Sequence, residues 1–172
     1  AYGNMLVFCK TAEPAGQAAA DELFAGNVVI DGVAENIRLT DGRAFSNPRN
    51  FTAKNITYSR YFGKQSQPGQ SAGWEAMVLP FDVQSIVNEE KACRLAPFGL
   101  ADYVQIMPMW VSIWNASGNA FEACTLPKAN VPFIAQVPNN EAYYEERFNM
   151  GGTIVFSAED VQVSVSQTSE ES

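Results

Sequence analysis

Apolar and polar residues alternate along much of this chain, and a period of two predicts β-strands rather than helices. The pattern is clearest in two runs, 51–62 and 74–83, which flank a loop rich in Gly, Ser, Gln and Pro. Each run places its apolar side chains on one face: Ile56, Tyr58 and Phe62 in the first, and Met77, Leu79, Phe81 and Val83 in the second. Two such runs joined by a polar loop predict a long β-hairpin.

Shorter apolar runs separated by turn residues predict further strands. They cover residues 5–9, 27–30, 37–39, 103–114, 121–126, 127–137, 153–156 and 161–166. The turn signals between them are Asp31-Gly32, Asp41-Gly42 and Gly118-Asn119. The last run alternates most cleanly and predicts that Val161, Val163 and Val165 face inward. Pro108 interrupts the run 103–114 and predicts two strand segments joined at a bulge.

Two segments have helical rather than alternating character. Residues 18–24 favour a short helix, with Gly26 at the position after its end. In the segment 82–95, Val83, Ile86 and Val87 can share one helical face, and Asp82 is a suitable N-cap. We therefore expect at most two short helices in the chain.

About ten short strands with frequent turn signals predict an all-β fold, a β-sandwich of jelly-roll-like arrangement with one or two short helices. The length of 172 residues suits one domain, which we expect to cover residues 1–166. Residues 167–172 read as a polar tail or the start of a linker.

Composition removes several functional classes. The net charge of −8 argues against nucleic acid, whose phosphates need a basic surface. The chain has no histidine, which removes the common catalytic triads and the usual general base. Cys9, Cys93 and Cys124 are far apart and lack metal-ligand spacing, so they read as small buried side chains. We therefore expect a protein that is not an enzyme and has no cofactor and no metal site.

Targeting signals are also missing from the sequence as it stands. No run of about 18 apolar residues exists, so we expect no direct membrane insertion by this segment. The first residues lack the basic and apolar regions of a signal peptide, and we expect that a leader has been removed.

Four segments resemble a known family. They read NVVIDGVAENIRLTDGRAF, FTAKNITYSRYF, GWEAMVLPFDV and ANVPFIAQVP in that order, and the resemblance covers residues 27–156. In this order they are similar to secreted cell-surface proteins of gut Bacteroidetes, of the Bacteroides and Prevotella type, whose β-modules are often found with leucine-rich repeats. The shared motifs are packing and turn motifs, so the resemblance implies no catalytic residue. It implies an extracellular or outer-membrane location.

Aromatic residues are the strongest candidates for a binding site. Trp110 and Trp114 are four apart, so on a strand they lie on the same face, while Tyr143 and Tyr144 lie in an acidic loop. The alternative is that Trp74, Trp110 and Trp114 are core anchors. The acidic doublets are adjacent in sequence, so on a strand they would point to opposite faces, unlike a glycosidase pair.

These observations favour a non-catalytic surface module for adhesion or for binding a glycan or a host surface protein. Two alternatives stay open. The chain is a structural spacer in a larger surface protein, or it is a carboxylate-based glycoside hydrolase. An exposed aromatic strip would favour binding, whereas fully buried tryptophans would favour the spacer.

Overall fold

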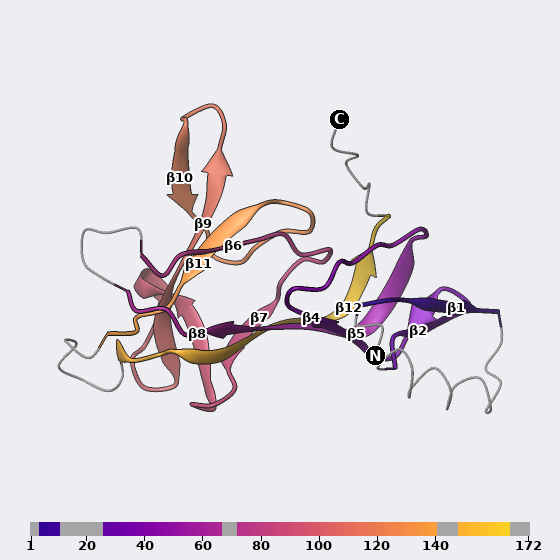
Figure 1. The fold of residues 1–172 in the computed structure, drawn as a ribbon, viewed down its shortest axis with the longest axis horizontal. Coiled ribbons are helices and arrows are strands. Elements are labelled where there is room, and N and C mark those ends of the chain that lie inside the picture. Colours follow the sequence, from indigo (N-terminus) through magenta and orange to yellow (C-terminus); the bar gives the residue numbers. More distant parts are fainter. Residues whose placement is uncertain (1–3, 11–25, 67–71, 141–147, 166–172) are drawn as a thin grey trace. The chain divides into compact units, whose positions relative to one another are not determined.

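The computed structural model describes residues 4–10, 26–66, 72–140 and 148–165, and they are nearly all β (Figure 1). The elements are β1 (Val7–Cys9), β2 (Val28–Ile30), β3 (Val33–Ala34), β4 (Ile37–Thr40), β5 (Phe51–Phe62), β6 (Glu75–Met77), β7 (Ser85–Asn88), β8 (Cys93–Pro97), the 3₁₀ helix η1 (Phe98–Leu100), β9 (Ile106–Asn115), β10 (Ala120–Ala123), β11 (Phe133–Gln136) and β12 (Gly152–Val163). The predicted all-β fold is confirmed, while the jelly-roll-like sandwich stays a prediction. The expected helix at 18–24 and the tail 167–172 lie outside the described residues. Within these ranges, no helix has the length and apolar character needed to cross a bilayer.

The chain divides into two compact units, and each is described by itself. The first comprises Ala1–Tyr58 with Ser157–Ser172, and the second comprises Ser59–Phe156. The strand order is β1-β2-β3-β5-β12 in the first unit, with β4 also on β5, and β12-β7-β8-β9-β11-β6 in the second, with β10 on β9. β1 pairs with β2, β3 with β5 and β8 with β9 in parallel orientation. The single domain expected over residues 1–166 stays a prediction.

Buried asparagines join loops and strands in the first unit. The Asn27 side chain accepts a hydrogen bond from Arg38 N at 2.7 Å and donates to Arg38 O at 2.9 Å. Asn4 pairs with the backbone of Thr40 in the same way. At Asp31-Gly32 both residues have positive φ, 47° and 78°, which fits the predicted tight turn between β2 and β3.

The two long strands change the face that they bury partway along. In β12, alternate residues are buried from Gly152 to Ala158, but the next buried residue is Val163, after Asp160 with φ of 48°. An extra residue at this point reverses the alternation, as in a β-bulge. The predicted strands 153–156 and 161–166 are therefore parts of one strand. The inward orientation predicted for Val165 is wrong, because its side chain is 44% exposed.

The predicted hairpin between 51–62 and 74–83 is also wrong. The first run is the long strand β5, but the second contains only the short strand β6, which pairs with β11. Alternation fixed the buried side chains correctly, since Met77, Leu79, Phe81 and Val83 are all buried. The alternation could not predict which strand pairs with this run, because a strand with one apolar face can pair with any strand that completes the same core.

The predicted helix at 82–95 is wrong as well, and β7 and β8 form an antiparallel pair there. Ile86 and Asn88 are the buried positions of β7, so a buried asparagine hides the period of two. Asp82 caps no helix and instead accepts hydrogen bonds from Ala129 N at 2.8 Å and Lys128 Nζ at 3.0 Å.

Pro108 lies within one continuous strand, β9, which changes partners near it. The first part of β9 pairs with β8 from Ile106 to Met109. The second part pairs with β11 and β10 from Trp110 to Asn115. The predicted hairpin through Gly118-Asn119 is confirmed, and Asn119 has φ of 48°.

Candidate ligand-binding surface

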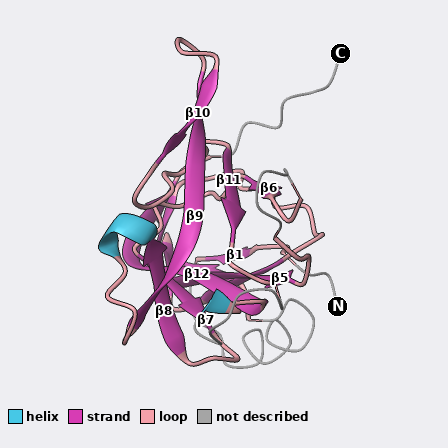
Figure 2. Cartoon of the chain, turned by 90° about the vertical axis from the view of Figure 1, so that its left-hand side faces the viewer, coloured by secondary structure: helices cyan, strands magenta, loops and turns pink. Residues whose placement is uncertain are grey.

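Four strands of the second unit form a small sheet in the order β10-β9-β11-β6 (Figure 2). Its inner face carries the buried side chains Met77, Val111, Phe133 and Ala135. Its other face, called here the outer face, carries Trp110, Ser112 and Trp114 of β9, because side chains alternate along a strand. In both views the β9–β10 hairpin extends beyond β11 and β6 (Figures 1 and 2).

Strand register sets the outer-face side chains in rows across the sheet. One row contains Phe121 opposite Trp114, and continuing the same register adds Pro132 and Val78. The rings of Trp114 and Phe121 meet edge to face with centroids 5.1 Å apart. Trp114 is 46% exposed, Phe121 52% and Val78 55%. This row is a large apolar strip that remains in contact with solvent.

The next row is made of smaller side chains, and a hollow opens beside the strip. Ile134 lies between Ser112 and Ala76 in register. The hollow measures 340 Å³ and is lined by Ala76, Met77, Val78, Trp114, Phe121, Pro132, Phe133 and Ile134. Every one of these side chains is apolar. We call this site the Trp114 hollow.

The third row contains Trp110 and Gln136, and an aromatic cluster surrounds Trp110. The Trp110 ring lies 4.7 Å from the Phe98 ring and 6.5 Å from the Trp74 ring, centroid to centroid. Across the strand pair, Gln136 donates a hydrogen bond to Ala72 O at 2.5 Å. A Cβ at Gly73 would come within 2.7 Å of Gln136 Nε2, so only glycine fits there. Trp110 is consequently half-buried and enclosed by its neighbours.

The hairpin turn holds the Trp114–Phe121 pair in place. Asn115 Oδ1 accepts hydrogen bonds from Ser117 N at 2.9 Å and from Gly118 N at 3.1 Å, as in an Asx turn. Its Nδ2 donates to Glu122 Oε1 across the strands at 2.6 Å. The turn thereby fixes which residues of β9 and β10 stand opposite each other.

The sequence-based candidates have different outcomes. Trp110 and Trp114 do share one face of a strand, as their spacing predicted, and Trp114 is no core anchor. Tyr143 and Tyr144 lie outside the described residues, so their predicted role stays a prediction. The sequence analysis missed Phe121, although its position across the Gly118-Asn119 turn from Trp114 could have identified it.

A second, polar hollow of 380 Å³ lies in the same unit. Its lining contains Tyr61, Phe62, Gly63, Gln65, Glu90, Lys91, Asn139, Asn149, Gly151 and Gly152. A Cβ would lie only 2.5 Å from the Tyr61 ring at Gly63 and 2.7 Å from Asn139 at Gly151. These glycines therefore let an aromatic ring and an amide lie directly against the backbone. We call this site the Tyr61 hollow.

Ionisable groups in the second unit have structural partners. Glu75 is buried and forms ion pairs with Arg60 at 2.5 Å and Lys64 at 2.9 Å. Cys93 and Cys124 are free thiols, both half-buried rather than fully buried, and burial raises the pKa of each. Over the part of the chain that the structure covers, no three Cys, Asp or Glu side chains are grouped to hold a metal ion.

Comparison with known proteins yields no relative for this chain. No protein-family model, no curated protein and no solved structure matches it. The fold and its surface define an all-β protein with an exposed aromatic hairpin.

Proposed function

We propose that this chain is a non-catalytic adhesion module, displayed outside the cell, which binds a partner protein by an apolar side chain seated in the Trp114 hollow. The observation that carries the proposal is the exposed row of Phe121, Trp114 and Val78 beside a hollow whose lining residues are all apolar. The extracellular location rests on the resemblance to secreted surface proteins, together with the acidic charge that disfavours nucleic acid.

Exposed aromatic residues of this kind are energetically unfavourable in water unless a partner covers them. Contiguous apolar patches on soluble proteins usually mark interaction sites. Tryptophan is also among the residues that contribute most to binding when they lie at the centre of an interface. Trp114 has this position, since Phe121 flanks it on β10 and Pro132 follows on the β11 side. A structural spacer would have no use for such a row.

The lining of the hollow favours an apolar protein side chain over a sugar. Sugar hydroxyls seated there would lose water without gaining a hydrogen-bonding side chain, at a cost of about 1–3 kcal/mol for each group. An aliphatic or aromatic side chain incurs no such cost. The net charge of −8 further favours a partner whose rim is basic, because opposite charges accelerate and orient encounter.

A phage-displayed random peptide library tests this proposal directly. We expect selected peptides to share a large apolar anchor residue. Trp114→Ala, which removes a wall of the hollow, and Ala76→Phe, which fills it, should each weaken peptide binding at least about tenfold, or 1.4 kcal/mol. Leu100→Ala is the matched control, because Leu100 is 56% exposed and lies outside the hollow. Failure to select any peptide, or binding unchanged by both variants, would favour the spacer.

A second site, the Tyr61 hollow, supports glycan binding independently of the Trp114 hollow. It offers an exposed aromatic ring beside amide and carboxylate groups, the combination that sugars require for stacking and hydrogen bonding. A glycan array screened with wild type, Tyr61→Ala and Trp114→Ala separates the two sites. Glycan signals lost only in Tyr61→Ala support a second, sugar-binding role. An array without signal, or a signal that Tyr61→Ala leaves intact, excludes this role and leaves the Trp114 hollow as the binding site.

A further inference from the structure

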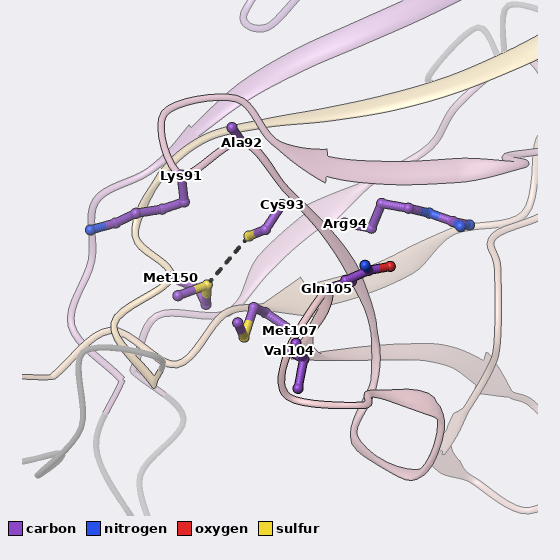
Figure 3. A pocket seen from close by; sticks show the side chains of 8 residues that line it. All are labelled: Lys91, Ala92, Cys93, Arg94, Val104, Gln105, Met107 and Met150. Carbon is purple, nitrogen blue, oxygen red and sulfur yellow. Dashed lines mark hydrogen bonds between the residues drawn. The ribbon is translucent and has the colours of Figure 1, made fainter.

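Three sulfur-containing side chains line a cavity of 580 Å³ in the second unit, near the turn between β7 and β8 (Figure 3). They are Cys93 at the start of β8, Met107 in β9 and Met150 just before β12. Figure 3 shows the Cys93 thiol directed at the Met150 thioether, and Met107 as another residue that lines the same cavity. We call this group the sulfur cluster.

The spacing of the sulfur atoms suits a shared metal ion. Cys93 Sγ and Met150 Sδ are 3.9 Å apart. A soft metal bound to sulfur at about 2.3 Å, with ligands about 120° apart, holds two sulfurs about 4.0 Å from each other. The two atoms therefore already stand at the separation that a trigonal sulfur site requires, and Met107, which lines the same cavity, would supply the third ligand.

Buried Asn88 fixes the backbone on both sides of this cluster. Its Nδ2 donates a hydrogen bond to Met150 O at 2.8 Å, and its Oδ1 accepts one from Lys91 N at 2.9 Å in the turn before Cys93. Asn88 also stands opposite Cys93 in the β7–β8 register. Met107 stands opposite Leu95, two residues beyond Cys93 on β8. The cluster is thus held by strand pairing and by a fully buried amide.

We propose that the sulfur cluster is a binding site for a soft monovalent metal ion, Cu(I), with Cys93 as thiolate and Met107 and Met150 as thioether ligands. Thiolate and thioether ligands select Cu(I) over harder ions. The described lining contains no carboxylate, and Lys91 and Arg94 add positive charge that disfavours divalent ions. On binding, the thiol releases its proton to solvent and the sulfur bonds to the metal, with no change of oxidation state.

Sequence spacing alone predicted no metal site, and the fold explains why it was missed. Cys93, Met107 and Met150 are widely separated along the chain and belong to three segments. The parallel pairing of β8 with β9 and the Asn88 contact to Met150 bring them together. The ligand is the Cys93 thiolate, so metal binding displaces the thiol proton and should strengthen as pH rises.

An anaerobic titration of the full chain with Cu(I), in competition with a chromogenic Cu(I) chelator, tests the proposal. We expect one ion per chain and release of one proton. Cys93→Ser should lower the affinity for Cu(I) more than about 100-fold. This loss is larger than the loss that follows when a residue that only supports a metal ligand is changed. Met150→Leu and Met107→Leu keep the side-chain volume and should each weaken binding, and Ag(I) should reproduce the pattern without redox chemistry.

Cys124→Ser is the matched control, because Cys124 is also a half-buried free thiol with a raised pKa. It should bind Cu(I) as wild type does. Unchanged affinity in Cys93→Ser would overturn the proposal, and so would equal loss in Cys124→Ser. Absence of any stoichiometric binding by folded wild type would leave the 3.9 Å contact as a weak thiol hydrogen bond that packs the core.

Discussion

The N-terminal half of β9, which finishes at Trp110, and its C-terminal half, which contains Trp114, carry the same kind of residue on the same face, yet they differ in what covers it. We call the first half the enclosed end of β9 and the second half its open end. Trp110 lies between Phe98 and Trp74, with ring centroids 4.7 Å and 6.5 Å away. Trp114 meets the edge of the Phe121 ring and remains 46% exposed. The strand pattern determines the face of a side chain, but the segments packed over that face determine its exposure. The enclosed end of β9 therefore contributes to stability, while the open end is available for binding.

The turns next to these ends also differ. At the enclosed end, Asp102 Oδ1 accepts hydrogen bonds from Val104 N, Gln105 N and Ile106 N, each at 2.8 Å. At the open end, the uncharged Asn115 organises the hairpin turn. The enclosed end therefore depends on an ionised carboxylate, whereas the open end depends on an amide that does not titrate.

The largest expected effect comes from the inner face, which is core at both ends of β9. Phe133 is fully buried, pairs with Ile113 in register and contacts the Phe156 ring at 5.9 Å. Phe133→Ala should lower the free energy of unfolding by about 3–5 kcal/mol in chemical denaturation. Ile134→Ala, on the outer face next in the chain, should cost less than about 1 kcal/mol. Similar losses in both variants would mean that the two faces do not differ as described.

The two tryptophans should differ in the same measurement. Trp110→Ala removes a half-buried ring from an aromatic cluster and should cost about 2 kcal/mol of unfolding free energy. Trp114→Ala should cost less than about 1 kcal/mol, because the side chain is 46% exposed and its aromatic neighbour Phe121 is exposed as well. A larger loss for Trp114→Ala than for Trp110→Ala would contradict the comparison and make the hairpin a structural element.

Alternation in the sequence was enough to predict most of the strands and several of their buried faces. Met77, Leu79, Phe81 and Val83 are buried as predicted, and Trp110 and Trp114 share a face. The strand partners could not be predicted in this way, because β5 and β6 are consecutive along the chain but have different neighbours. Partner choice depends on the completed core, and a period of two carries no information on it.

Buried amides account for the main error in secondary structure. Asn88 occupies an inward position of β7, where its side chain bonds Met150 O and Lys91 N. A hydrophobic pattern counts such a residue as exposed, so the segment 82–95 looked helical.

The Trp114 hollow was only partly predictable for a different reason. Trp114 was identified, but Val78, Pro132 and Ile134 come from other strands and needed the fold to bring them near it.

A spectroscopic difference should follow from the exposure of Trp114. Its fluorescence should be the most readily quenched by acrylamide among the tryptophans, because Trp74 and Trp110 are only partly exposed. Trp114→Phe should remove the most quenchable component while leaving the unfolding midpoint almost unchanged. Trp110→Phe is the control and should leave that component in place. Quenching that survives in Trp114→Phe would show that the open end of β9 is covered in solution.

The smallest effect is a pH dependence limited to the enclosed end. The N–H groups of Ile106, Val104 and Gln105 hold the pKa of Asp102 below its ordinary value of 3.8. A carboxylate with a lowered pKa stabilises the fold fully above the ordinary value, and the contribution is lost as pH falls through the lowered one. The amide NMR signals of Val104 and Gln105 should therefore shift only below about pH 4, and Asp102→Asn should abolish the titration.

The Ser117 and Gly118 amides, measured in a Glu122→Gln background, should stay constant, because the Asn115 amide cannot ionise. If those two amides titrate in that background, or if those near Asp102 do not, the two ends of β9 are not organised by different chemistry.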